Sequence, residues 1–86
     1  MDEEHKRMSW ASRRGMLELD LILEPFVRLH YPSLDTAGRA RYRDLMTCQD
    51  QELFDWFLRK QLPDNADLAD MVRTILDARR PEDIPL

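Results

Sequence analysis

The sequence predicts an all-α fold, a compact irregular bundle of five helices in a single domain. The chain has 86 residues, which is the size of one small domain. Its apolar residues recur every three or four positions, as in a helix, and no long segment alternates with a period of two. The breaks between these segments span only a few residues, so successive helices should pack against each other.

The first expected helix covers residues 2–13. It opens with three acidic residues and closes with basic ones, an arrangement that suits the helix dipole. Gly15 follows shortly, and a glycine in the left-handed conformation is a common end of a helix. We therefore expect Gly15 to terminate this helix.

The second expected helix covers residues 18–30. Its apolar residues share one face at helical spacing: Leu19, Ile22, Leu23 and Phe26. Pro25 lies inside this pattern, and proline lacks the amide hydrogen of a helical bond, so we expect a kink or a short 3₁₀ turn there. Pro32 should end the segment, because the residue before a proline leaves the helical region.

Three more helices are expected in the second half of the chain. One begins after an N-cap at Asp35 and ends near Met46. The next begins at Asp50 and carries the aromatic residues that should close the core. The last begins near Asn65 and has the cleanest apolar stripe, formed by Leu68, Met71, Val72, Ile75 and Leu76.

Composition limits the possible functions. The chain is 43% hydrophobic with a mean hydropathy of −0.61, which is typical of a soluble globular domain. Its longest apolar runs have three residues, whereas a membrane-spanning helix needs about 20. The N-terminus has no signal-peptide pattern, and the lone Cys48 cannot form an intramolecular disulfide. We expect a cytoplasmic bacterial protein, with a domain over residues 1–80 and a loose tail over 81–86.

The distribution of charge argues against nucleic acid as the partner. The net charge is −4, and an acidic protein repels the phosphate backbone. Residues 1–43 contain eight basic and seven acidic side chains, against five and ten in residues 44–86. A DNA-binding interpretation of Arg39, Arg41 and Arg43 is weak, because a spacing of two turns each side chain by about 200° around a helix.

The sequence shows no self-sufficient catalytic or metal site. His5 and His30 are far apart and lack metal-ligand spacing. A nucleophilic pair of Cys48 and His30 stays open, although a lone cysteine between helices more often serves packing. Two isolated glycines cannot form a phosphate-binding loop. We therefore predict that the chain is not an enzyme and binds no metal.

The segment over residues 13–20 concentrates charge around a glycine. On the pattern alone, a structural interpretation is favoured, with Gly15 as a helix cap and the charged residues at helix ends. The functional interpretation is a recognition loop. Gly15 would let another protein's backbone approach, and Arg14 would donate bidentate hydrogen bonds to a carboxylate or phosphate. Glu18 would accept a bond from the partner or hold Arg14 in place.

The Arg-Gly-x-x-Glu pattern of Arg14, Gly15 and Glu18 resembles the signature of the SdhE family, small assembly factors for the flavoprotein subunit of succinate dehydrogenase. The resemblance covers roughly residues 6–80 and continues through Pro25-Phe26, Asp50-x-x-Leu53-Phe54-x-Trp56 and Met71-Val72-Arg73. Some relatives have a cysteine where this chain has Ser12. A serine fits the same small space, so no loss of function is inferred.

The resemblance implies a function. The family promotes covalent attachment of FAD to a histidine of the flavoprotein, in succinate dehydrogenase and in bacterial fumarate reductase. It resembles a chaperone that holds the immature flavoprotein in a productive arrangement. The resemblance makes Arg14, Gly15 and Glu18 the first partner-binding residues, followed by Arg13, Asp20 and Arg7.

Further expectations concern ligands and partners. With no dinucleotide fingerprint, the chain should not bind FAD tightly by itself and should act on FAD held by the flavoprotein. We expect a monomer without nucleic-acid binding or membrane insertion. The alternative function is the antitoxin half of a toxin–antitoxin pair, as which some family members are described.

Overall fold

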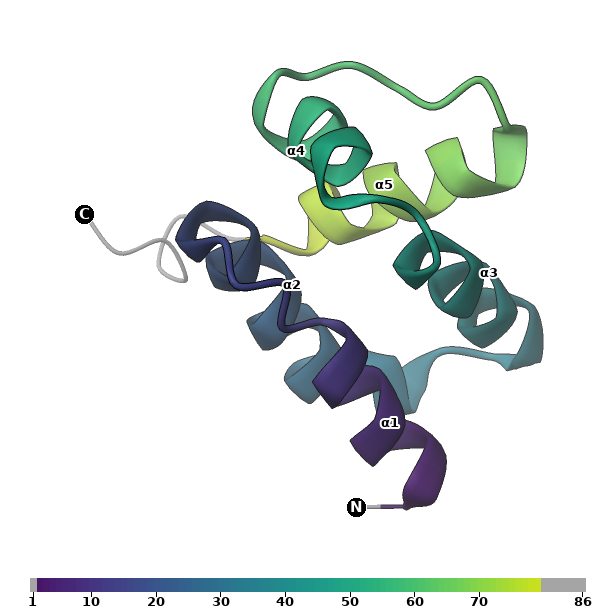
Figure 1. Ribbon diagram of the computed structural model, residues 1–86. Coiled ribbons are helices and arrows are strands. Elements are labelled where there is room, and N and C mark those ends of the chain that lie inside the picture. Colours follow the sequence, from purple (N-terminus) through teal and green to yellow (C-terminus); the bar gives the residue numbers. More distant parts are fainter. Residues whose placement is uncertain (1, 80–86) are drawn as a thin grey trace.

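The computed structural model describes residues 2–79, which form five α-helices and one short 3₁₀ helix and contain no strand (Figure 1). The all-α prediction is thus confirmed. The predicted tail, residues 81–86, lies outside the described residues, so the domain boundary stays a prediction. The elements are α1 (Glu3–Ala11), α2 (Leu17–Leu29), η1 (Tyr31–Ser33), α3 (Thr36–Met46), α4 (Asp50–Leu58) and α5 (Ala66–Ala78).

Short-range capping explains where the helices begin. The Asp35 carboxylate accepts the backbone N–H of Gly38 at 2.7 Å, and the Asn65 side chain accepts that of Leu68 at 3.0 Å. Such bonds satisfy N–H groups that have no partner inside the helix. The starts of α3, α4 and α5 that the sequence predicts at Asp35, Asp50 and Asn65 are confirmed to within one residue.

The end of α1 differs from the prediction. The helix stops at Ala11, and Ser12 is its C-cap. Both the amide and the hydroxyl of Ser12 donate to the carbonyl of Met8, at 3.0 and 2.7 Å. The next amide, that of Arg13, bonds to the carbonyl of Trp10 at 3.1 Å, only three residues back, so the α-helical pattern ends here, three residues before Gly15. Gly15 has the expected left-handed backbone, with φ +80°, but it does not cap α1.

Pro25 is accommodated inside α2, which continues through it without a 3₁₀ turn. The carbonyl of Leu21 loses its helical partner, because Pro25 has no amide hydrogen, and Leu21 is 47% exposed. The 3₁₀ turn comes instead at Tyr31–Ser33, where Pro32 ends the α-helical segment.

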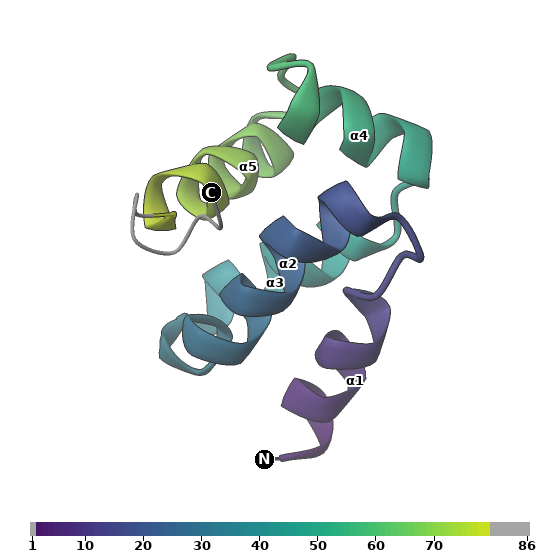
Figure 2. The ribbon, with the colours of Figure 1, turned by 90° about the vertical axis from the view of Figure 1, so that its left-hand side faces the viewer.

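Helix α2 lies at the centre of the bundle. It contacts α1, η1, α4 and α5, and α3 packs against α5. In Figure 2, α1 lies below α2, and α4 and α5 lie above it. The predicted apolar stripes face the core, which consists of Met8, Leu19, Ile22, Leu23, Phe26, Val27, Tyr31, Tyr42, Leu45, Met46, Leu53, Phe57, Met71, Val72 and Ile75. Among the α4 aromatics, Phe57 is buried, whereas Phe54 and Trp56 are half-buried.

Helix α1 has only one buried residue, Met8, so apolar packing contributes little to its first half. Polar contacts hold that half in place. The Glu4 carboxylate accepts from the Tyr31 hydroxyl at 2.8 Å, Arg43 at 2.6 Å and Arg39 at 3.2 Å. The bond from Tyr31, with those from the two arginines, holds the pKa of Glu4 below its usual value, although burial opposes this. These contacts fix the direction of α1 and thus where its following loop lies.

Candidate functional site

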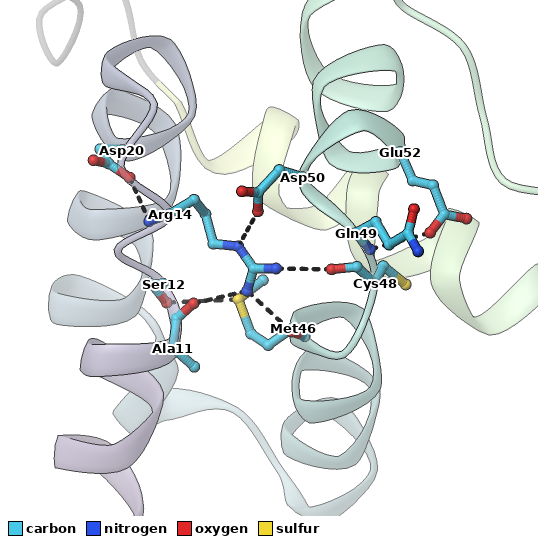
Figure 3. Close-up of polar contacts among 9 residues, drawn as sticks. All are labelled: Ala11, Ser12, Arg14, Asp20, Met46, Cys48, Gln49, Asp50 and Glu52. Atoms are coloured by element: carbon cyan, nitrogen blue, oxygen red, sulfur yellow. Dashed lines mark hydrogen bonds and ion pairs between the residues drawn. The ribbon is translucent and has the colours of Figure 1, made fainter.

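The loop between α1 and α2, residues 12–16, is anchored by the side chain of Arg14 (Figure 3). Its Nη1 atom donates to the carbonyls of Ala11 and Met46, both at 3.0 Å. Its Nη2 atom donates to the carbonyl of Cys48 at 2.7 Å, and its Nε atom to Asp50 Oδ1 at 2.7 Å. Only 15% of this side chain is exposed. Arg14 therefore joins the end of α1, the end of α3 and the start of α4.

The carbonyls at the end of α3 explain why an arginine fits here. The last carbonyls of a helix have no intrahelical partner, and the planar guanidinium presents five donors in a fixed fork. Arg14 satisfies these carbonyls, and Asp50 balances its charge. The guanidinium thus bonds its own chain and is not presented for the bidentate recognition of a partner that the sequence suggested.

The neighbouring carboxylates have separate roles. Asp20, in the first turn of α2, accepts the backbone N–H of Arg14 at 2.9 Å and so fixes the loop backbone. Glu18 is exposed, and its side chain makes no hydrogen bond or ion pair with the described residues. The suggestion that Glu18 holds Arg14 is wrong, because Asp50 does so. Asp50 lies 36 residues from Arg14 along the chain, so no local sequence pattern indicated that it belongs to this site.

Gly15 and Arg13 face outward beside this anchor. A Cβ atom on Gly15 would meet nothing within 4 Å, so the loop presents bare backbone to solvent. Arg13 is 66% exposed and pairs with Glu24 at 3.0 Å, with its guanidinium 5.8 Å from the centre of the Trp10 ring. Arg7 is also exposed, on α1, without an ion pair to any residue of the described part. Of the six predicted residues, Arg14 and Asp20 thus stabilise the loop, and the other four are accessible.

Ser12 forms a buried polar contact directly behind the loop. Its hydroxyl lies within hydrogen-bond distance of the Tyr42 hydroxyl and is fully buried. Burial raises the pKa of Tyr42 well above its usual value, so the phenol is neutral at physiological pH. A small polar residue fits this position, in agreement with the expectation for Ser12.

Cys48 and His30, the possible nucleophilic pair, contact different residues. The Cys48 thiol faces the carbonyl of Asp44, and burial raises its pKa, which disfavours the nucleophilic thiolate. The His30 ring packs against the Phe26 ring, with 5.4 Å between the ring centres. Over residues 2–79, no group of three histidine, cysteine, aspartate or glutamate side chains is placed to hold a metal ion. Over the same residues, no helix has the length and apolar character needed to cross a bilayer.

Comparison with known proteins gives the family. Residues 6–79 match the family described as "Flavinator of succinate dehydrogenase". The chain belongs to this family. It is 52% identical over 81 residues to the FAD assembly factor SdhE of Pseudomonas aeruginosa, covering 94% of this chain and 96% of that protein. The proteins of the same name from Pseudomonas syringae and Idiomarina loihiensis are 51% and 45% identical, covering 94% and 86% of this chain and 96% and 82% of those proteins.

These matches confirm the resemblance to the SdhE family. The matched range of residues 6–79 contains the whole α1–α2 loop and all the residues that hold it. The family is therefore one of FAD assembly factors for succinate dehydrogenase, and the loop described above lies inside the part of the chain that matches it.

Proposed function

We propose that this protein is an assembly factor that binds the immature flavoprotein subunit of succinate dehydrogenase and promotes covalent attachment of FAD to it. We extend the proposal to the flavoprotein of fumarate reductase. The chain would act as a monomer in the bacterial cytoplasm, without catalysing the attachment itself, and on FAD held by the flavoprotein. Membership of the flavinator family is the observation that carries the proposal.

The structure supports a binding role for the α1–α2 loop. Arg14 ties the loop to three other segments, so its backbone conformation is set before a partner arrives. A preformed loop loses less conformational entropy on binding than a mobile one. Gly15 lets a partner backbone approach closely, and the exposed Glu18 and Arg13 flank it with opposite charges.

We assign the six residues to two roles on this basis. Gly15, Glu18, Arg13 and Arg7 would contact the flavoprotein. Arg14 and Asp20 would act indirectly, by holding the loop in the conformation that presents those residues. An ordered loop at the partner surface could then hold the flavin and its acceptor histidine in a reactive arrangement.

Substitution of Gly15 tests the proposal. The flavoprotein subunit is expressed in cells without their own assembly factor, together with this chain, and covalent flavin is read as fluorescence in a denaturing gel. The native chain should give a bright flavoprotein band. Gly15→Arg should reduce it at least ~10-fold, the effect of losing about 1.4 kcal/mol of binding. Gly15→Ala should give an intermediate band.

The alanine variant is the matched control for backbone strain. Both substitutions place an L side chain at φ +80°, which costs about 1 kcal/mol in each, so their melting temperatures should agree. An unfolded Gly15→Arg by circular dichroism would show that the glycine serves folding. Equal bands in every lane, including cells without any factor, would refute the proposed function and favour the antitoxin alternative.

A further inference from the structure

A groove follows the outer side of the α1–α2 hairpin. One part is lined by Lys6, Ser9, Trp10 and Arg13. The second part shares Ser9 and Arg13 and continues along α2 over Asp20, Leu21, Glu24, Pro25, Val27 and Arg28. We call this continuous surface the α1–α2 groove. It begins at the α1–α2 loop, which contains both Arg13 and Gly15.

The groove and the loop carry large apolar side chains in contact with solvent. Trp10 is 71% exposed, Leu21 is 47% exposed, and Leu17 at the loop end is 68% exposed. Four of the five exposed large apolar side chains in the described residues lie on α1 and α2; Leu62 is the exception. Exposed apolar side chains that gather on one face are typical of a protein-binding surface.

The unneutralised charges of the groove are positive, although the chain has a net charge of −4. The acidic side chains of the groove are already engaged: Asp20 accepts from the Arg14 backbone, and Glu24 pairs with Arg13. Lys6 and Arg28, in contrast, form no side-chain hydrogen bond or ion pair with the described residues.

The antiparallel packing of the two helices brings these cations to the same end of the groove. His5 Nε2 lies 2.7 Å from the carbonyl of Val27, and Lys6 and Arg28 are the next residues along each helix. One end of the groove is therefore cationic, while Trp10 and Leu21 provide apolar surface toward the loop.

We propose that the α1–α2 groove docks a segment of the flavoprotein subunit that carries apolar side chains toward the Gly15 loop and carboxylates toward Lys6 and Arg28. This inference rests on the proposed function and extends the contact surface from the loop along α2. Lys6 and Arg28 would complement the charge of the partner's carboxylates. The apolar part of the groove adjoins the α1–α2 loop. Carboxylates would steer association, and burial of Trp10 and Leu21 would supply affinity.

Matched pairs of variants test the groove. Leu21→Asp and Arg28→Glu alter it, whereas Leu62→Asp and Arg73→Glu make the same changes elsewhere. Leu62 is 46% exposed on the connection after α4, and Arg73 is 57% exposed on α5. Binding of each purified chain to a purified bacterial flavoprotein subunit is measured by calorimetry, and co-expression reports flavin attachment.

We expect the groove variants to raise Kd at least ~10-fold and the controls to change it less than ~2-fold. The effect of Arg28→Glu should shrink as salt is raised, because the ion pairs it removes are screened. All four variants should retain the native circular dichroism spectrum, since the altered side chains are solvent-exposed.

Three outcomes would overturn the groove assignment. If the native chain binds and promotes attachment and all four variants match it, the groove is not the docking surface and the proposed function stands. If the native chain neither binds nor promotes attachment, the proposed function fails and the groove assignment with it. If sedimentation shows a dimer that Leu21→Asp dissociates, the occupant is a second copy of this chain.

Discussion

Two connections in this bundle contain a residue with left-handed backbone, and they are held in different ways. In the α1–α2 loop the residue is Gly15, with φ +80°, and in the α4–α5 connection it is Lys60, with φ +57°. The long α4–α5 connection arches over the top of Figure 1. Its backbone is held locally: the amides of Arg59 and Gln61 both donate to the carbonyl of Asp55, at 3.2 Å. The α1–α2 loop instead receives the four side-chain bonds of Arg14.

The difference shows that a left-handed residue can serve two purposes. Lys60 directly follows the C-cap of α4, so its conformation ends a helix. Gly15 lies three residues beyond the C-cap of α1 and ends none. The fold also accepts a side chain at positive φ at Lys60. Helix termination therefore does not explain the glycine at position 15, whereas the close approach of a partner's backbone under the proposed function would.

The largest expected effect comes from removing the anchor. Arg14→Ala should lower the free energy of unfolding by about 3 kcal/mol, because it deletes four bonds from a side chain that is 15% exposed and leaves carbonyls unsatisfied. In a domain of this size that loss lowers the melting temperature by more than about 10 °C. Urea unfolding followed by circular dichroism measures it.

The matched change in the other connection is Arg59→Ala. The Arg59 side chain is 65% exposed, and its Nη1 atom lies 3.8 Å from Asp55 Oδ1. Its loss should therefore lower the free energy of unfolding by less than about 0.5 kcal/mol. Equal losses in the two variants would contradict the contrast between an anchored and a locally held connection.

A smaller effect is expected from Asp50→Asn, which retains an oxygen acceptor for Arg14 Nε and removes the negative charge. The variant should lose about 1 kcal/mol of unfolding free energy. Asp70→Asn serves as the control, because its 3.4 Å contact with Arg73 is exposed on both sides and should contribute little. A neutral Asp50→Asn would mean that the carbonyl bonds alone hold Arg14.

The smallest expected effect is a gain of stability, whereas the substitutions above lower it. Lys60→Gly relieves an L residue at positive φ and should stabilise the chain by about 0.5 kcal/mol, measured as a rise in the urea midpoint. Gly15→Ala introduces the strain that Lys60→Gly removes. If both substitutions shift the midpoint in the same direction, backbone strain does not explain either effect.

Local sequence signals were sufficient for most of the fold. Asp35 and Asn65 are N-caps whose bonds reach only three residues along the chain, and the apolar stripe of α2 lies on one helix face. The end of α1 was not predictable in this way. The C-cap is Ser12, whose hydroxyl contacts that of Tyr42, 30 residues away, and no local pattern indicates this contact.

The candidate site shows the same limit more sharply. The motif over residues 14–18 was visible in the sequence, and it led to the correct family. The sequence suggested a recognition role for its arginine, because the acceptors at Met46, Cys48 and Asp50 are 32 to 36 residues away along the chain. Only the tertiary structure brings those acceptors to Arg14 and separates its anchoring role from the exposure of Gly15 and Glu18.

The anchor has a consequence for how mutations in this motif would appear in a living cell. Loss of Arg14 should reduce the amount of protein, because a destabilised domain is removed by cellular proteases. Under the proposed function, loss of the Gly15 surface should lower the amount less than loss of Arg14 does, because it costs about 1 kcal/mol and not about 3, and should mainly reduce the action of each molecule. Two adjacent residues of one motif would thus produce the same growth defect through different routes, one through abundance and one through specific activity.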